Sequence, residues 1–257
     1  MSLPEHERSQ GARPAHEGTE AAAADHVREL FTSIAPTYDR LNHLLSFGLD
    51  RRWWRHAALT FRDTLGKPDA RVLDLCCGTG DMTAALLALR PAAAEPITGL
   101  DFSPRMLSLA RTKYANANVQ WVEGDAMALP YPDSSFDLVT AAFGFRNLSN
   151  YAGGLTEIHR VLRPGGSIGI LECNQPGGIT GTLYSLYFRH ILPLVGGWIS
   201  GSRAAYGWLP ASVERFPRPP RMLKMLQEAG FTECGWDGYL LRAAGLYRGI
   251  KPASNRT

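Results

Sequence analysis

Short apolar segments alternate with helical segments from residue 71 to residue 173, and this alternation constrains the fold more than any other feature of the chain. The apolar segments predict strands at 71–75, 97–100, 119–123, 136–142 and 167–173, with helices between them at 79–89, 104–114 and 151–162. Strands that are joined through helices pair in parallel and carry helices on both faces of the sheet. We therefore predict a doubly wound α/β fold.

The chain on either side of this alternation is expected to add helices and a hairpin. The pattern from residue 31 to residue 61 is helical and is broken at Pro36 and at 46–48. Further helices are expected at 182–194 and 221–229, and two last strands near 234–240 and 243–250 are expected to pair. We expect ordered structure to begin near Val27. Residues 1–25 are predicted to be a mobile tail, 26–251 a single domain, and 252–257 a second tail.

The composition is that of an ordinary globular protein. The 257 residues carry a formal net charge of +3, and 45% of them are hydrophobic while 20% are charged, which excludes global disorder. Lys and Arg are interleaved with acidic residues, so the chain lacks the basic stripe that is typical of nucleic-acid-binding proteins. We therefore expect no nucleic-acid partner.

The same reasoning favours a cytoplasmic protein. The N-terminal segment lacks the apolar core of a secretory signal, and the most apolar stretch, 179–199, is interrupted by Arg189, His190 and Pro193. The four cysteines include no C-x-x-C pair, so we expect neither a metal site nor a disulfide framework. Two alternatives stay open for the segment 51–55, Arg-Arg-Trp-Trp-Arg: a peripheral contact with the inner membrane surface, or a solvated helix face.

A glycine-containing loop follows the first predicted strand, with the sequence Asp74-Leu75-Cys76-Cys77-Gly78-Thr79-Gly80-Asp81. Glycines at such a turn let a ligand approach the backbone closely. Dinucleotide sites use G-x-G-x-x-G, but the third position here is Thr83, and the loop contains no Lys or Arg. The loop therefore does not match a diphosphate site.

Two carboxylates flank the loop instead. Asp74 and Asp81 would repel a diphosphate and attract a cation, and S-adenosylmethionine (SAM) carries a sulfonium and an ammonium but no phosphate. We therefore predict SAM rather than NAD, with Asp74, Gly78 and Gly80 among the cofactor-binding residues. The alternative is structural: Asp81 would complement the helix dipole and Asp74 would accept a backbone hydrogen bond.

Acidic residues also follow the second and third predicted strands. Asp101 ends the second strand and could accept both ribose hydroxyls, as in other nucleoside-binding folds. Asp125 follows the third strand, where it could accept the adenine amino group while the Ala126 N–H donates to the ring. Ligands of open α/β sheets bind at these carboxyl ends of the strands, so we predict that all three residues bind the cofactor.

The fourth predicted strand runs into Phe143-Gly144-Phe145-Arg146-Asn147, at the same edge of the sheet. An Arg beside aromatic rings suits a planar, anionic acceptor, although Arg146 could equally pair with a helix acid. Aromatic and polar side chains elsewhere could roof an apolar pocket or simply pack in the core. These are Tyr38, Asp39, Asn42 and His43, and later Tyr184, Tyr187, Phe188 and Trp198.

These segments together resemble the ubiquinone/menaquinone biosynthesis C-methyltransferases, from about Val27 to Lys251. The resemblance rests on the loop at 72–81, the turn Arg163-Pro164-Gly165-Gly166, the segment 31–39 ending in Tyr38-Asp39, and Phe143-Gly144-Phe145-Arg146-Asn147. The last two are the more specific to this family. The resemblance implies a Rossmann-like class I methyltransferase fold, in which a mostly parallel seven-stranded sheet has an antiparallel last strand and extra N-terminal helices.

The resemblance also implies a function, with SAM as the methyl donor and a prenylated demethylated quinol as the acceptor. Thr79, Asp101, Asp125 and Ala126 correspond to the family's cofactor positions. We expect Arg146 to polarise the quinol oxygen or its bound water, since an Arg is itself a poor base. Tyr38, Asp39 or His43 is expected to complete the proton path. We expect the substrate to bind at Asn147, Phe143 and His43, and no metal to be needed.

Smaller sequence features indicate which branch of the family the chain resembles and which other functions stay possible. The Cys76-Cys77-Gly78-Thr79 form resembles the menaquinone branch, so demethylmenaquinol is the favoured acceptor. Two positions depart from the family pattern, Ala142 and the segment 240–243. The alternatives are a ubiquinone-branch enzyme, a methyltransferase for another small apolar acceptor, a SAM-binding component without catalysis and, least favoured, a dehydrogenase. The oligomeric state stays open, with a homodimer among the alternatives.

Overall fold

The computed structural model describes residues 11–12, 19–35, 39, 43, 46, 48–176 and 203–253, with the side chains of residues 20, 203–207 and 209 left out. Several predicted features lie outside the described residues: the helix at 182–194, Tyr38, Asn42, Tyr184, Tyr187, Phe188 and Trp198.

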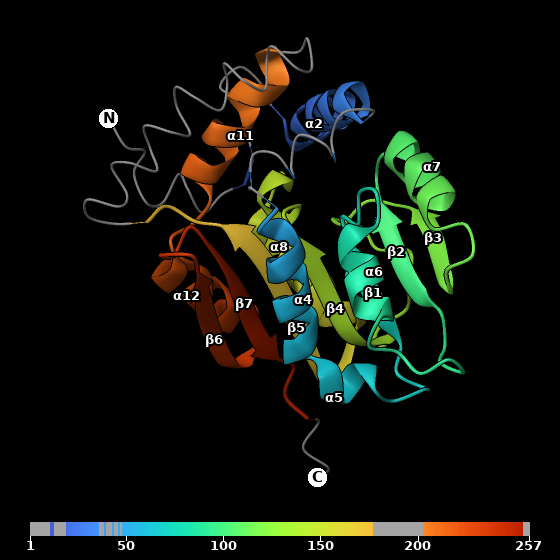
Figure 1. The fold of residues 1–257 in the computed structure, drawn as a ribbon. Helices are drawn as coiled ribbons and strands as arrows, with labels where there is room; N and C mark the ends of the chain where they lie inside the picture. The colour runs from blue at the N-terminus through green and yellow to red at the C-terminus, as the bar shows by residue number, and fades with distance from the viewer. Residues whose placement is uncertain are drawn as a thin grey trace.

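One seven-stranded sheet forms the centre of the molecule, in the order β3-β2-β1-β4-β5-β7-β6 (Figure 1). Its strands are β1 (Val72–Leu75), β2 (Ile97–Asp101), β3 (Val119–Glu123), β4 (Phe136–Ala142), β5 (Leu162–Cys173), β6 (Thr232–Tyr239) and β7 (Ala244–Ile250). The first five strands pair in parallel, and β7 is antiparallel to both of its neighbours. The predicted mostly parallel sheet and the predicted C-terminal hairpin are confirmed.

The helices in the described part of the chain are α2 (Glu20–Ile34), α4 (Asp50–Thr60), α5 (Arg62–Leu65), α6 (Asp81–Leu87), α7 (Pro104–Lys113), the short 3₁₀ helix η1 (Phe145–Asn147), α8 (Tyr151–Val161), α11 (Arg203–Arg215) and α12 (Pro219–Glu228). None of them is long and apolar enough to span a bilayer.

Capping residues explain where these helices begin. Ser103 accepts a hydrogen bond from the Met106 N–H and Pro104 stands at the first position of α7, as predicted. α6 begins only at Asp81, because Gly80 before it has a left-handed backbone (φ +92°). α2 begins at Glu20, where the Thr19 side chain caps it, so the predicted start of ordered structure near Val27 is too late.

Both faces of the sheet are covered, which explains why its central strands are almost continuously apolar. Neighbouring residues of β1 point to opposite faces: Val72 packs in a cluster with α4 and α6, and Leu73 in a cluster with α8 and α12. The same alternation holds for Leu138 and Val139 in β4. The parallel strands therefore lie in a rigid core, with their carboxyl ends at one edge of the sheet (Figure 1).

Candidate active site

A pocket that is partly open to solvent lies at the carboxyl ends of β1, β2, β3 and β4. The pocket is lined by Ala24, Phe31, Cys76, Gly78, Leu100, Asp101, Phe102, Met106, Gly124, Asp125, Ala126, Met127, Ala142, Phe143, Gly144, Asn147, Leu148 and Ser149. Four of the predicted cofactor residues and two of the predicted substrate residues therefore share one pocket.

The glycine loop leaves open space on the pocket side. Gly78 has φ +55°, and no atom lies within 4 Å of the position that a Cβ would occupy there. Gly80 is different, because a Cβ there would lie 2.6 Å from the Trp121 ring and 3.1 Å from the Tyr114 ring. Gly78 therefore leaves room for a ligand, whereas Gly80 makes room for the protein's own aromatic side chains and does not line the pocket.

Asp101 is the best-placed acceptor in the pocket wall. Its carboxylate accepts the Gly78 N–H at 2.8 Å through one oxygen and the Ser103 N–H at 2.9 Å through the other. Burial raises the pKa of this carboxyl to about 6. Each carboxylate oxygen has a second lone pair, so Asp101 can accept two further hydrogen bonds from a ligand. It also ties the loop after β1 to the loop after β2.

Asp125 and Ala126 stand at the start of the loop between β3 and β4. One Asp125 oxygen accepts the Met127 N–H at 2.8 Å, and Ala126 is buried against the core. The remaining carboxylate oxygen has no other partner among the described residues, so it can accept a hydrogen bond from a ligand.

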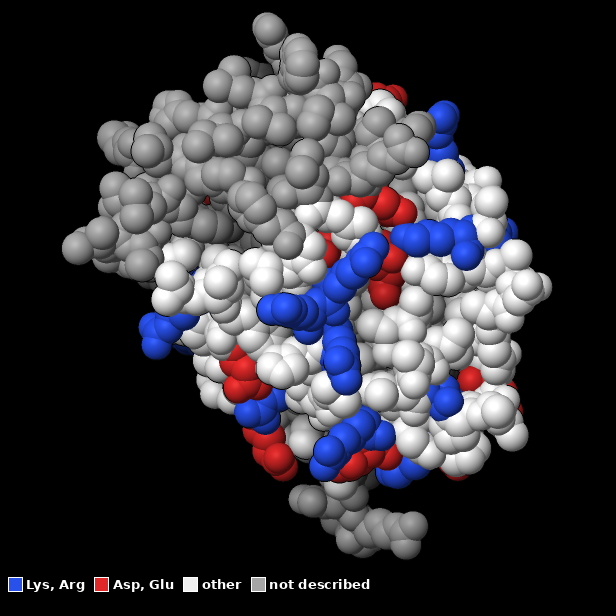
Figure 2. Space-filling view, in the orientation of Figure 1, with Lys and Arg blue, Asp and Glu red and all other residues white. Residues whose placement is uncertain are grey.

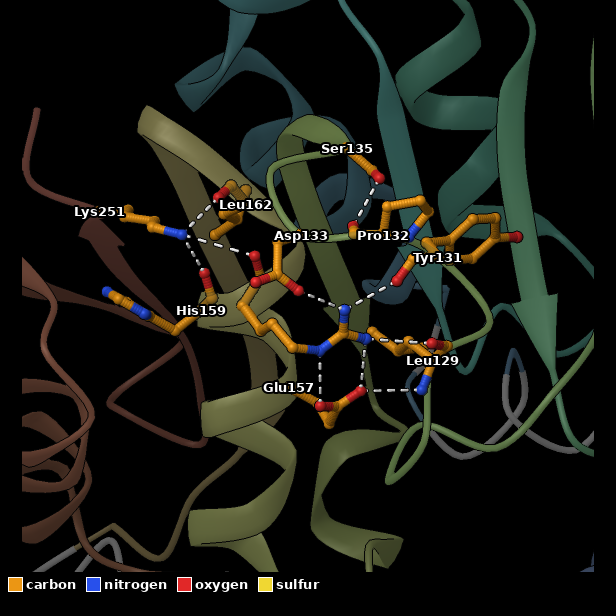
Figure 3. Close-up of polar contacts among 10 residues, drawn as sticks. Leu129, Tyr131, Pro132, Asp133, Ser135, Glu157, His159, Leu162 and Lys251 are labelled. Carbon is orange, nitrogen blue, oxygen red and sulfur yellow. Dashed lines mark hydrogen bonds and ion pairs between the residues drawn. The ribbon is translucent and has the colours of Figure 1, made fainter. Parts of the chain in front are cut away.

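Arg160 of α8 holds the far part of this loop (Figure 3). It forms a two-pronged pair with Glu157, with both N···O distances 2.9 Å, and donates to the carbonyls of Leu129 and Tyr131 and to the carboxylate of Asp133. All five of its N–H donors are thereby used. Glu157 also accepts the Leu129 N–H, so helix α8 fixes the loop that presents Asp125 and Ala126.

A second basic residue fixes the end of the same helix. Lys251, directly after β7, donates to the carbonyls of His159 at 2.8 Å and Leu162 at 2.7 Å (Figure 3). His159 lies in the last turn of α8, whose carbonyls lack partners within the helix, and Leu162 is the residue directly after that helix. The end of the chain's last described strand therefore caps the helix that supports the pocket wall.

Asp74 does not line the pocket. Its fully buried carboxylate accepts the hydroxyls of Thr83 at 2.6 Å and Thr140 at 2.9 Å, and burial raises its pKa to about 7. The residue therefore joins β1, α6 and β4 beneath the loop. Thr83, which stands where a dinucleotide site would have glycine, supplies one of those hydroxyls. Cofactor binding through Asp74 stays a prediction. The buried position of its carboxylate beneath the loop does not favour it.

Asp81 also has partners within the protein, which its position in the sequence does not indicate. Lys113 of α7 contacts Asp81 at 2.7 Å and Asp39 at 2.7 Å, and the Tyr114 hydroxyl donates to Asp81 at 2.9 Å. The hydroxyl of Thr79 donates to Asp39 at 2.5 Å. Asp81 was expected to attract a cationic ligand. In the structure, the cation beside Asp81 is the protein's own Lys113. Thr79 of the glycine loop thus contacts Asp39, and neither residue lines the pocket.

Arg146 forms a buried ion pair. Its guanidinium lies 2.8 Å from one carboxylate oxygen of Glu172, and its backbone N–H donates to the other oxygen at 3.0 Å. Glu172 itself is fully buried in β5. Arg146 also donates to the Phe143 carbonyl, and Tyr151 donates to the Arg146 carbonyl. Arg146 is not part of the pocket wall. Arg146 does pair with an acid, but the predicted helix acid is wrong, because the partner Glu172 lies on strand β5.

The turn that Arg146 stabilises carries the two predicted substrate residues that line the pocket. Phe143 has a left-handed backbone (φ +57°), and its ring packs 6.1 Å from the Trp53 ring. The Asn147 side-chain oxygen accepts a hydrogen bond from Trp208 at 3.1 Å. His43, in contrast, does not line the pocket: its Nδ1 lies 2.6 Å from Asp50, and its ring packs edge-on against Trp54.

Helix α2 closes part of the pocket, a contribution that the sequence does not predict. Ala24 and Phe31 reach the pocket wall from a helix that was predicted to start later in the chain. The alanine-rich segment that begins α2 resembles a tail in composition, and only the capping Thr19 indicates a helix start.

The pocket suits a cationic nucleoside better than a diphosphate. Its described wall carries two carboxylates, Asp101 and Asp125, and no Lys or Arg. SAM fits this wall, because Asp101 has free lone pairs for hydroxyls and Gly78 leaves space beside the backbone. No cluster of His, Cys, Asp and Glu that could hold a metal ion occurs among the described residues.

Comparisons with known proteins agree with this reading. The chain is 48% identical to the demethylmenaquinone methyltransferase of Deinococcus radiodurans over 208 residues, which is 80% of this chain and 84% of the relative. It is also 48% identical to the enzyme of that name from Thermus thermophilus over 206 residues, 79% of this chain and 91% of the relative.

A solved SAM-dependent methyltransferase of Thermotoga maritima shares the fold at a TM-score of 0.59 and 21% identity, covering 87% of this chain and 99% of that one. The ubiE/COQ5 methyltransferase family matches residues 19–251, nearly the whole described chain. The chain is therefore a member of the ubiE/COQ5 methyltransferase family.

Proposed function

We propose that the protein methylates a ring carbon of demethylmenaquinol, with SAM as the methyl donor. The observation that carries this proposal is the pocket itself, whose acidic end suits a cationic nucleoside and whose other end is formed by Phe143 and Asn147. The relatives that are 48% identical are named demethylmenaquinone methyltransferase, and that name supplies the acceptor. The proposed reaction needs no metal ion.

At the acidic end, the chain's own groups bind and orient. Asp101 would accept the ribose hydroxyls, Asp125 the adenine amino group, and the Ala126 N–H would donate to the adenine ring. When bound, SAM supplies an electrophilic methyl group. Holding two reactants in alignment accounts for about 7–11 kcal/mol of the barrier to such a reaction, so positioning can supply a large part of the catalysis.

At the other end, the chain would hold the acceptor ring and exclude water. The negative charge of a deprotonated quinol and the positive charge of the donor cancel as the new bond forms, so a dry pocket favours the reaction. Phe143, Leu148 and Phe31 provide apolar wall there. Arg146 forms an ion pair with the buried Glu172. It would therefore act by fixing the turn that carries Phe143 and Asn147.

The proton path is the open part of this mechanism. Asp39, which is predicted to take part in the proton path, accepts hydrogen bonds from Thr79 and Lys113. Tyr38 lies outside the described residues. Their catalytic roles, a homodimer and the absence of a nucleic-acid partner stay predictions.

A competition assay tests the proposal. Reduced demethylmenaquinol and a demethylated benzoquinol are mixed with SAM and the purified protein, and the lipids are analysed by mass spectrometry. We expect a methyl group on the naphthoquinol ring. Methylation of the benzoquinol alone would move the enzyme to the ubiquinone branch. Tight SAM binding with no transfer to either acceptor would contradict the proposed activity.

A further inference from the structure

The tip of the β6–β7 hairpin exposes two leucines. Leu240 is 53% exposed and Leu241 is 72% exposed, and they are the large apolar residues that stand out to solvent in the described chain. Leu240, Leu241 and Arg242 all have left-handed backbone conformations, with φ of 41°, 51° and 71°. Such conformations are costly for residues other than glycine, and they cluster at functional sites. The tip therefore presents apolar side chains on a strained turn.

A basic helix face lies next to this tip. Arg51, Arg52 and Arg55 are exposed on α4, and none of them forms an ion pair with a described residue. Positions 51 and 55 are one turn apart and 52 is beside them, so the three side chains share one side of the helix. Figure 2 shows Lys and Arg side chains gathered on the face over α4. Within the part of the chain that the structure describes, these three positive charges have no acidic partner.

Two aromatic contacts join these features to each other and to the pocket. The His56 ring of α4 packs 5.6 Å from the Tyr239 ring, directly before the two leucines. The Trp53 ring of the same helix packs against Phe143 in the pocket wall. The arginines and leucines therefore form one surface, which adjoins the acceptor end of the pocket.

We propose that Arg51, Arg52, Arg55, Leu240 and Leu241 form a docking surface for an anionic lipid bilayer. The leucines would enter the headgroup region and the arginines would contact lipid phosphates, the arrangement that suits a protein lying on a membrane. The inference rests on the proposed function in one respect: a prenylated acceptor resides in the bilayer, so docking would bring the pocket to it.

The test is co-sedimentation of the full chain with vesicles, without SAM or acceptor. Vesicles of phosphatidylglycerol and phosphatidylcholine are compared with phosphatidylcholine alone, and we expect binding to the first and little to the second. Each basic residue near an anionic surface strengthens binding roughly fivefold, so R51Q/R52Q/R55Q should weaken it about 100-fold. L240S/L241S should also weaken binding, with less dependence on salt.

The matched control is R62Q/K67Q/K224Q, which removes the same charge from exposed residues elsewhere. It should change vesicle binding less than twofold, and thermal melting confirms that each variant folds. Equal loss in the control and in R51Q/R52Q/R55Q would overturn the proposal, as would failure of the unaltered chain to bind anionic vesicles.

A water-soluble demethylated naphthoquinol with a short tail separates this inference from the proposed function. R51Q/R52Q/R55Q and L240S/L241S should methylate it at the unaltered rate. Methylation without vesicle binding would refute the docking surface alone, and vesicle binding without methylation would refute the proposed activity alone.

Discussion

The two ends of the pocket use charge in opposite ways. At the end proposed to bind the cofactor, Asp101 and Asp125 line the pocket and keep oxygen lone pairs that no described residue uses. At the end proposed to bind the acceptor, the charges of Arg146 and Glu172 pair with each other in the core, beside the turn that carries Phe143 and Asn147. A charged residue within a functional motif can therefore either bind the ligand or stabilise the pocket wall. Its interaction partners within the protein indicate which of the two roles it has.

The sharpest way to break this comparison is to remove Glu172. Glu172→Gln would leave the buried Arg146 guanidinium without its counter-charge, and breaking a buried pair from one side costs about 3–5 kcal/mol. We expect the free energy of unfolding in urea to fall by that amount. A loss below about 1 kcal/mol would mean that the pair does not stabilise the turn.

The double variant Arg146→Met with Glu172→Gln is the control, because it removes both charges together and should be more stable than Glu172→Gln. If it regains turnover along with stability, Arg146 acts only by positioning. If it regains stability but not turnover, Arg146 acts on the acceptor directly, as the sequence predicts.

Removing Asp101 probes the other end. Asp101→Ala deletes the carboxylate proposed to accept the ribose hydroxyls, and a hydrogen bond to a charged group contributes about 1.5–3 kcal/mol. We expect the Kd for SAM, measured by calorimetry, to rise roughly 10- to 150-fold. Asp63→Asn, at an exposed residue far from the pocket, should leave it unchanged. An unaltered Kd in Asp101→Ala would refute the assignment.

The buried Asp74 should make stability depend on pH in an unusual direction. Burial raises its pKa from 3.8 to about 7, so between these values the folded protein binds more protons than the unfolded chain. Stability must then fall as pH rises from about 4 to about 7, by at most roughly 1.4 kcal/mol per pH unit from this group. Asp74→Asn should flatten that part of the profile of Tm against pH. Identical profiles for the two proteins would contradict the prediction.

The smallest expected effect concerns Arg160. Arg160→Lys keeps the charge but loses the two-pronged pair and most of the hydrogen bonds to the loop of Leu129 and Tyr131. The KM for SAM should rise several-fold, about 1 kcal/mol, while kcat at saturation stays the same. Arg163→Lys, which alters a pair with Asp137 away from the pocket, is the matched control. A fall in kcat with constant KM would assign Arg160 another role.

The sequence predicts the sheet and half of the site for a local reason. Strand ends can be recognised from apolar periodicity, and in a parallel sheet they must meet at one edge, so Asp101, Asp125 and Asn147 fall in the pocket as predicted. The choice of ion-pair partner is not local. Lys113 meets Asp81 across 32 positions of sequence and Arg146 meets Glu172 across 26, and nothing in the spacing indicates either pair. The burial of Asp74 is equally hard to predict from the sequence, because the two hydroxyls that it accepts come from α6 and β4.

The place of β7 in the sheet has a consequence for how the chain folds. β7 follows β6 in sequence but lies between β5 and β6, so β6 cannot join the sheet until β7 has been made. The same late segment carries Lys251, which caps helix α8 about 90 positions earlier. During synthesis at about 5–20 residues per second, the parallel strands emerge several seconds before the strand that completes them. Until then, one side of β5 is an open edge, and the growing chain is most exposed there to pairing with another copy of itself.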